Sequence, residues 1–383
     1  MTHPPVLLGI DFGGTKIATA VCDLAGNKLA SAVVDSLGQR GARASFDQGV
    51  ATATGLLNGH AAGAAVAAVG VATFGIPFED RVELAPVIDG WERLELGREL
   101  RAAFPGAAIS MGTDTKTAAQ AEARWGALVD CDPAIYLNLG TGLAAAIVIG
   151  GRVLSGSQGA AGEIGYSLRE PADVGRAGGP RIPLEDMVSG QALQRRAASL
   201  GRSLHSAGSG SAGSGIASAD GHSLTAAEVF AAAASDPDLN DLVTEFVDEL
   251  AFHLVNLAIA VNPARIAVGG GITRSWDRIS PRLEEALRTW VPYPPDLVLG
   301  HFPQEAPLLG AVALAVDAAA DLASAPVATT PSTPGSTDPS YNGNMQTDNY
   351  KGHYYNEKNN AYQRPQGDFL AGAPQATSYP ADL

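Results

Sequence analysis

The chain has 383 residues, of which 46% are hydrophobic and 17% charged, and this composition is typical of a globular protein with more than one core. Its 25 Lys and Arg against 40 Asp and Glu give a net charge of −15, which disfavours non-specific binding to nucleic acid or to an anionic membrane. The chain has only two cysteines, Cys22 and Cys131, which excludes a disulfide framework. The sequence shows neither a signal-like leader nor a stretch that approaches transmembrane length, so we expect a cytoplasmic protein.

Short apolar runs bounded by turn residues predict strands, and longer stretches with helical spacing predict helices. In chain order, the first part is expected to hold strands at 6–10, 16–23, 29–34, 65–72 and 108–111 and helices at 44–57, 94–104 and 115–128. The second part is expected to hold strands at 134–138, 144–149, 153–155 and 266–268 and helices at 183–200, 224–234, 239–261, 275–290 and 308–322. The strand meander at 6–34 resembles the one at 134–155, which predicts a duplicated α/β core with a cleft between its halves.

The domain boundaries follow from the same pattern. We expect an N-terminal α/β domain at 1–114, a C-terminal α/β domain at 115–307, and a closing helix at 308–322 that packs back on the first domain. Residues 206–216 consist almost wholly of Gly, Ser and Ala and predict a flexible loop. Residues 326–383 are rich in Pro, Ser, Thr, Asn and Gly without any helix or strand period, and they predict a disordered tail.

Three glycine turns follow predicted strands: Asp11-Phe-Gly-Gly-Thr-Lys16, Gly140-Thr-Gly142 and Gly269-Gly-Gly271. Each alone is an ordinary turn by default. Three of them at strand ends indicate a phosphate-binding cleft, because glycine lets backbone N–H groups approach an anion closely. Asp11, at the end of the first strand, is placed to hold Mg²⁺ through water.

Asp114 begins a predicted helix and has two competing interpretations. It either caps the helix N-terminus or acts as the general base of a phosphoryl transfer, in which case Thr113 or Thr115 supplies the cap. Lys116, in the same turn, is expected to be a solvated lysine, with phosphate binding or electrostatic tuning of Asp114 as the alternatives. Glu163 lies in a glycine-framed loop that suits hydrogen bonding to vicinal hydroxyls, although such a loop acid is more often solvated. The seven histidines show no ligand spacing and predict no metal site.

Taken together, these motifs resemble the ROK family of sugar kinases over roughly residues 7–322. The resemblance rests on DFGGTK (11–16), GVATFGIP (70–77), AP…GW (85–91), TDTKTAAQAEA (113–123), LNLGTG (137–142), GAAGEIGY (159–166), LEDMVSG (184–190), NPARIAVGGGI (262–272) and LLGAVALA (308–315). It implies an actin-like ATPase (ribonuclease H-like) fold, with two α/β domains around a nucleotide cleft. The activity it implies is transfer of the γ-phosphate of ATP, with Mg²⁺, to a sugar hydroxyl.

The resemblance also implies a role for individual positions. Asp114 matches the catalytic base, and Asp11 matches the acid on the metal side. The positions that match the nucleotide side are Asp11, Gly13, Gly14, Thr15, Lys16, Gly140, Thr141, Gly142, Gly270 and Gly271. Those on the substrate side are Thr113, Glu163, Tyr166 and Glu185.

Four features of the family's glucokinase-like members are altered here, mainly on the sugar side. Thr113 replaces the Asn before the base, Val87 the Asn after the AP pair, and Tyr166 the His of the E-x-G-H loop. A cysteine-free segment at 175–182 replaces the zinc loop, so we expect no structural zinc, and its Arg176 and Arg181 are candidates for the rim of the cleft. Because unpaired buried hydroxyls disfavour binding, we expect glucose to bind poorly and a cyclitol, such as a C7-cyclitol, or a modified sugar to fit better.

Other functions compete with this one. A glucokinase or another hexose or aminosugar kinase is the first alternative, and a non-catalytic sugar-binding regulator is the second. A ROK repressor carries a helix-turn-helix domain ahead of the DFGGTK motif, and we expect the start of that motif at residue 11 to leave no room for one. By analogy with the family we expect a homodimer that binds a small-molecule polyol, with neither nucleic acid nor membrane as a partner.

Overall fold

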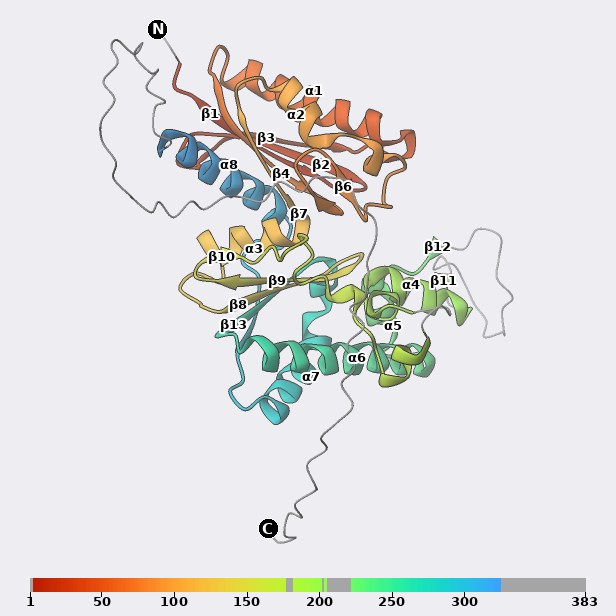
Figure 1. The fold of residues 1–383 in the computed structure, drawn as a ribbon. Coiled ribbons are helices and arrows are strands. Elements are labelled where there is room, and N and C mark those ends of the chain that lie inside the picture. Colours follow the sequence, from red (N-terminus) through yellow and green to blue (C-terminus); the bar gives the residue numbers. More distant parts are fainter. Residues whose placement is uncertain (1–2, 177–181, 202, 205–221, 325–383) are drawn as a thin grey trace, which may run out of the picture. The chain divides into compact units, whose positions relative to one another are not determined.

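The computed structural model describes residues 3–176, 182–201, 203–204 and 222–324 (Figure 1). Residues 1–326 form one compact unit. The expected loop at 206–216 and the expected tail at 326–383 lie outside the described residues.

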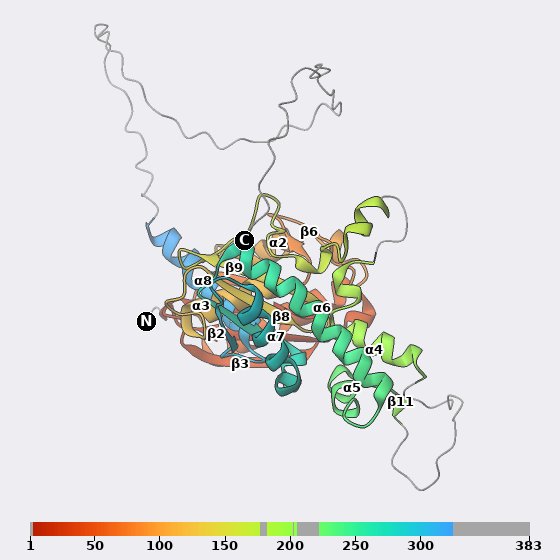
Figure 2. The same cartoon turned by 90° about the horizontal axis from the view of Figure 1, so that it is seen from below.

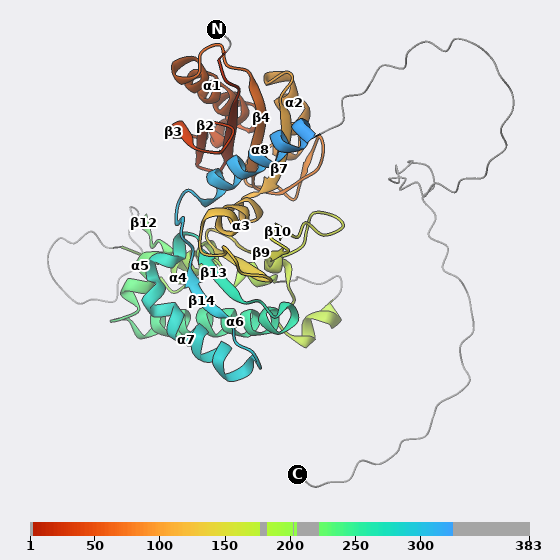
Figure 3. The same ribbon diagram turned by 90° about the vertical axis from the view of Figure 1, so that its left-hand side faces the viewer.

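The first sheet has the strand order β3-β2-β1-β4-β7. Its strands β1 (Val6–Phe12), β2 (Lys16–Cys22) and β3 (Lys28–Asp35) form an antiparallel meander, and β4 (Val66–Thr73) and β7 (Ala108–Thr113) run parallel to β1. Helices α1 (Ala42–His60) and α2 (Leu96–Ala103) cover one face and α8 (Ala306–Ser324) the other (Figure 3). Alternation along β1 explains both layers, because Leu8 and Ile10 pack toward α1 while Leu7 packs toward α8.

The second sheet repeats this topology in the order β10-β9-β8-β13-β14. Strands β8 (Ala134–Leu139), β9 (Leu143–Ile149) and β10 (Arg152–Val153) form the meander, and β13 (Arg265–Gly269) and β14 (Asp296–Leu299) are the parallel strands. The identical strand order confirms the predicted duplication of the α/β core. Among the described residues, two short antiparallel pairs of strands are added, β5 (Ile76–Pro77) with β6 (Val82–Glu83) and β11 (Ser203–Leu204) with β12 (His222–Ser223).

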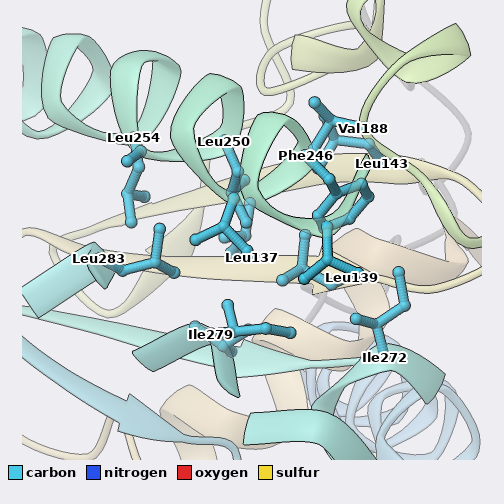
Figure 4. Close-up of a cluster of buried hydrophobic side chains, with 14 of the residues drawn as sticks. Leu137, Leu139, Leu143, Val188, Phe246, Leu250, Leu254, Ile272, Ile279 and Leu283 are labelled. Carbon is cyan, nitrogen blue, oxygen red and sulfur yellow. The ribbon is translucent and has the colours of Figure 1, made fainter. Parts of the chain in front are cut away.

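Helices on one face of the second sheet build the larger core (Figure 4). Leucines of β8 and β9 pack there against α6 (Pro237–Val261) and α7 (Trp276–Trp290), which lie side by side (Figure 2), and α4 (Gly190–Ser199) and α5 (Ala226–Ala232) extend this layer. The opposite face is covered by α3 (Asp114–Trp125). Short 3₁₀ turns complete the described chain at Gly38–Arg40, Trp91–Arg93, Ile164–Tyr166, Pro171–Arg176, Leu184–Asp186 and Gly271–Ser275.

Helices α3 and α8 cross at backbone contact. A Cβ added to Gly310 of α8 would come within 1.7 Å of the carbonyl oxygen of Thr117 in α3. A Cβ added to Gly70 of β4 would come within 1.8 Å of the carbonyl oxygen of Ala311. Glycine at these two positions therefore brings α8 into contact with the first sheet and with the helix that begins at Asp114.

The structure corrects two expectations about helices. The helix expected at 183–200 is interrupted: a 3₁₀ turn ends at Asp186, and α4 begins only at Gly190, where the Ser189 hydroxyl accepts a hydrogen bond from the N–H of Ala192 at 3.1 Å. The expectation that no stretch approaches transmembrane length is also wrong by length and composition, because α8 has 19 residues and an 18-residue window of it has a mean hydropathy of 1.6. The contacts of α8 with β1, β4 and α3 are those of a core helix.

Candidate active site

Two carboxylates stand at the same end of the first sheet. Asp11 lies near the end of β1, and Asp114 directly follows β7. Strands β1, β4 and β7 are parallel, and the register aligns Phe12 with Thr73 and Thr73 with Thr113. The two carboxylates therefore lie at one edge of the sheet with a single strand between them.

The cap of α3 resolves the competition for the Asp114 side chain. The Thr113 hydroxyl oxygen accepts a hydrogen bond from the N–H of Lys116 at 3.2 Å, so Thr113 is the N-cap and Asp114 is the first helical residue. Asp114 Oδ1 accepts hydrogen bonds from the N–H and the hydroxyl of Thr115, at 2.6 and 3.2 Å. The Asp114 carboxylate is thus oriented by its neighbour and is not consumed by capping.

The environment raises the proton affinity of both acids. Burial, with the negative charge of Asp114 as a second cause, raises the pKa of Asp11 to about 7. Burial also raises the pKa of Asp114, while the hydrogen bonds from Thr115 and the charge of Lys116 act in the opposite direction. Neighbouring carboxylates held in this way attract either a proton or a cation.

The donor set at this edge fits Mg²⁺. Among the described residues no group of three His, Cys, Asp or Glu side chains forms a metal site of its own. A cation beside Asp11 would therefore take its other ligands from water and phosphate oxygens, as Mg²⁺ does in enzymes that bind nucleotides.

The first glycine turn presents amides rather than carbonyls. The N–H of Gly13 donates to the carbonyl of Lys16 at 3.0 Å, which closes the turn. Ser36 holds two carbonyls of the turn: its hydroxyl donates to Gly14 O at 2.7 Å and its N–H donates to Thr15 O at 2.9 Å. The N–H groups of Gly14 and Thr15 have no hydrogen-bond partner among the described residues. Such a turn is suited to an anion.

The second glycine turn has the same character. The N–H of Gly140 donates to Gly142 O at 3.0 Å, and the carbonyls of Gly140 and Thr141 accept hydrogen bonds from Gly190 and Gln191, at 2.9 and 3.2 Å. Its carbonyls are therefore held by the first residues of α4. Within the described part of the chain the N–H groups of Thr141 and Gly142 have no partner.

The third glycine turn lies against the second. Gly270 has a φ of +93°, and a Cβ there would come within 2.4 Å of Leu139 O and 2.6 Å of Asn138 Oδ1. A Cβ on Gly271 would meet open space. Asn138, whose Nδ2 lies 3.3 Å from Thr115 Oγ1, therefore touches both the third turn and the helix that carries Asp114. Sequence reasoning missed it, although a polar residue inside an otherwise apolar strand was the available signal.

Lys116 is not the solvated lysine that was expected. Its side chain is only 9% exposed, and its Nζ donates to the carbonyl of Gly159 at 2.6 Å and lies 3.5 Å from Glu163 Oε1. The helical pattern places Lys116 on the first turn correctly but gives no sign of the loop that covers it.

The expected substrate-side acids lie together. Burial raises the pKa of Glu163, and the charges of Glu185 and Glu163 add to burial in raising the pKa of Tyr166. Glu185 also serves the second glycine turn, because its Oε2 accepts a hydrogen bond from the N–H of Leu143 at 2.8 Å. Glu163 is half-buried, whereas Glu185 and Tyr166 are exposed.

The remaining expected positions are less informative. Val87 lies over the first turn, since a Cβ on Gly14 would come within 2.5 Å of Val87 Cγ1. Lys16 is exposed at the start of β2. Arg181 and the side chain of Arg176 are not among the described parts of the chain.

Two sheets of identical topology, with glycine turns and two acids at the strand ends, define an actin-like ATPase fold. The profile of the ROK family matches residues 7–318, and the protein belongs to this family.

Individual relatives support this assignment. The chain is 32% identical over 203 residues to a kanosamine kinase of Amycolatopsis mediterranei, an alignment that covers 51% of this chain and 63%, or less than two thirds, of that curated relative. A ROK hexokinase from Thermus thermophilus is 27% identical, with a TM-score of 0.65 and coverage of 82% of this chain and 99% of its own. A ROK glucokinase from Streptomyces griseus in complex with glucose and AMPPNP is 27% identical, with a TM-score of 0.62 and coverage of 81% and 98%. These relatives are named sugar kinases, which are phosphotransferases with an alcohol acceptor.

Proposed function

We propose that the protein is an ATP-dependent kinase that transfers the γ-phosphate to the primary hydroxyl of a hexose-like ring. The observation that carries this proposal is the Asp114 carboxylate, which helix capping by Thr113 leaves available at the sheet edge that it shares with Asp11. The amide-lined turns at Gly14 and Thr141 are suited to the triphosphate.

Asp114 acts as the general base in this mechanism. Its carboxylate takes the proton of the acceptor hydroxyl while the hydroxyl oxygen bonds to the γ-phosphorus, and the bond from that phosphorus to the bridging oxygen breaks to release ADP. A pKa raised by burial strengthens Asp114 as a base. Asp11 would hold Mg²⁺ through water, and the ion supplies charge neutralisation to the phosphates when it is bound.

We propose that the acceptor is a cyclitol, such as a C7-cyclitol, or a modified sugar rather than glucose. The amide and imidazole that glucokinase-like members place in the sugar site are absent, and Thr113, Val87 and Tyr166 stand in their positions. Thr113 uses its hydroxyl oxygen to cap α3, and Val87 adds apolar surface beside Gly14. A hydroxyl that loses its partner on burial costs about 1–3 kcal/mol, which is sufficient to disfavour glucose.

An aminosugar is a second candidate acceptor, and the charge of the site favours it. Asp11, Asp114, Glu163 and Glu185 gather there with one buried cation, Lys116. An ammonium group on the acceptor would offset part of this excess. The relative named kanosamine kinase is consistent with this second candidate.

One assay separates these candidates. ADP release is measured with Mg²⁺ and ATP over a panel of hexoses, aminosugars and cyclitols, with Asp114→Asn as the inactive control. We expect turnover with a cyclitol or an aminosugar at a kcat/KM well above that for glucose. Turnover of none of them by the native chain would favour the non-catalytic sugar-binding regulator.

The cytoplasmic location and the homodimeric state stay predictions. Light scattering tests the homodimeric state.

A further inference from the structure

Lys116 occupies a position where a lysine is costly. Its side chain is buried, and the residue lies in the first turn of α3, where the helix dipole disfavours a positive charge. Two groups compensate the charge: the carbonyl of Gly159 at 2.6 Å and the carboxylate of Glu163 at 3.5 Å. Both belong to the loop that leads from β10 to the 3₁₀ turn at Ile164–Tyr166.

We propose that Lys116 is a positioning residue that fixes this loop and presents Glu163 to the acceptor as an ionised carboxylate. The proposal rests on the proposed kinase function and deepens it by assigning a recognition role to a residue two positions after the base. Lys116 acts through Glu163 and is not itself a catalytic residue.

Few other hydrogen bonds join this loop to the rest of the protein, so the contact of Lys116 with Gly159 contributes strongly to the position of the loop. Its start is held to β9 by the N–H of Leu154, which donates to Ile147 O at 2.8 Å, and its end by Gly162, whose carbonyl accepts from the N–H of Ala145 at 2.8 Å. At its middle, the N–H of Gly159 donates only to Gly156 O within the loop, at 3.4 Å, and the hydrogen bond that joins Gly159 to another element comes from Lys116. Removing the ammonium therefore frees the centre of the loop while its two ends stay attached.

The charges around Glu163 come from several elements. Lys116 and Asp114 face it from α3, Glu185 from the 3₁₀ turn at Leu184–Asp186, and Tyr166 from its own turn. Burial and the two acids favour the protonated form of Glu163, and Lys116 is the cation that opposes them. Without Lys116, Glu163 would therefore hold its proton to a higher pH.

This arrangement restricts the acceptor. An ionised carboxylate only accepts hydrogen bonds, so the group opposite Glu163 must be a donor, either a hydroxyl or an ammonium. An acceptor analogue that carries hydrogen or a methoxy group at that position is expected to lose affinity, because the carboxylate then stays unpaired.

The test is a double-mutant cycle on the full chain with the best acceptor from the assay above. Lys116→Met and Glu163→Gln are each expected to raise KM for the acceptor by about 10-fold or more, with KM for ATP within about 2-fold of the native value. The double variant is expected to be no worse than Glu163→Gln alone. Lys116→Arg keeps the charge and is expected to bring KM for the acceptor part of the way back to the native value. Lys28→Met, which removes a lysine from the exposed ion pair with Glu305, is the matched control.

A second readout does not depend on turnover. A ¹³C-detected titration of the glutamate carboxyls should show the pKa of Glu163 shifted upward in Lys116→Met. Multiplicative effects in the cycle, or an unshifted Glu163, would overturn the role of Lys116 while leaving the kinase intact. Absence of turnover in the native chain would instead overturn the proposed function, and with it the role of Lys116 toward an acceptor.

Discussion

Asn138 Nδ2 lies 3.3 Å from Thr115 Oγ1, and the same hydroxyl donates to Asp114 Oδ1 at 3.2 Å. Asn138 is the last residue but one of β8 in the second sheet, whereas Asp114 follows β7 in the first. A chain of two hydrogen bonds thus joins the strand that leads into the second glycine turn to the proposed base. The relationship ties the proposed base to the glycine turn that is proposed to bind phosphate.

Asn138→Ala is expected to lower kcat by about 10-fold and to raise KM for ATP, because it removes the bond to Thr115 and a side-chain contact of Gly270. Steady-state kinetics in both substrates measure this. Asn27→Ala, at an exposed turn where the Asn27 amide donates to Asp23 at 2.9 Å, is the matched control. Native kinetics in Asn138→Ala would show that the connection has no role in turnover.

Asp114→Asn is expected to leave ATP binding nearly unchanged and to lower kcat by about 100-fold or more, as for loss of a positioned base. Calorimetry with a non-hydrolysable ATP analogue measures the binding, and ADP release measures the turnover. Asp47→Asn, on the exposed face of α1, controls for the loss of a carboxylate. Near-normal turnover in Asp114→Asn would remove the base assignment.

The strands β1, β4, β8 and β13 were predictable because each is a mostly buried apolar run ended by turn residues. The edge strand β14 was missed, since its four residues are no more than half-buried and leave little pattern. The helix expected at 183–200 was too long because apolar residues at helical spacing continue on both sides of Ser189, so the pattern did not show that Ser189 is the N-cap. Asp114 and the glycine turns follow from local sequence, but the burial of Lys116 depends on a loop more than forty residues away.

Asp11→Asn is expected to stabilise the nucleotide-free protein at neutral and alkaline pH while impairing turnover. The pKa of Asp11 is about 7 when folded against 3.8 ordinarily, so the folded state keeps a proton that the unfolded chain has already lost. Stability from this group is complete below about pH 4 and is lost as the pH rises to about 7. An asparagine at this position has no charge to bury, so we expect the free energy of unfolding of Asp11→Asn to exceed that of the native chain by about 1–3 kcal/mol at pH 8.

Urea unfolding at pH 4.5 and pH 8 in the presence of EDTA measures this effect. The difference between the variant and the native chain should be small at the lower pH and larger at the higher one. Asp80→Asn, on an exposed loop, should show no such trend. A difference independent of pH would mean that Asp11 is ionised in the free protein.

Glu122→Gln is expected to destabilise the fold without altering the chemistry directly. Glu122 is fully buried in α3, and its carboxylate accepts hydrogen bonds from the N–H groups of Ala127, His301 and Phe302, at 2.7, 3.0 and 2.9 Å. The last two belong to the segment that leads from β14 into α8, so one side chain fastens α8 to the helix that begins at Asp114. An amide would turn an NH₂ group toward at least one of these donors, at a cost of about 2–4 kcal/mol. Denaturant unfolding measures the loss of folding free energy, and Glu284→Gln, at an exposed position on α7, is the matched control. Equal stability of the two variants would show that the buried Glu122 carboxylate does not hold α8 in place.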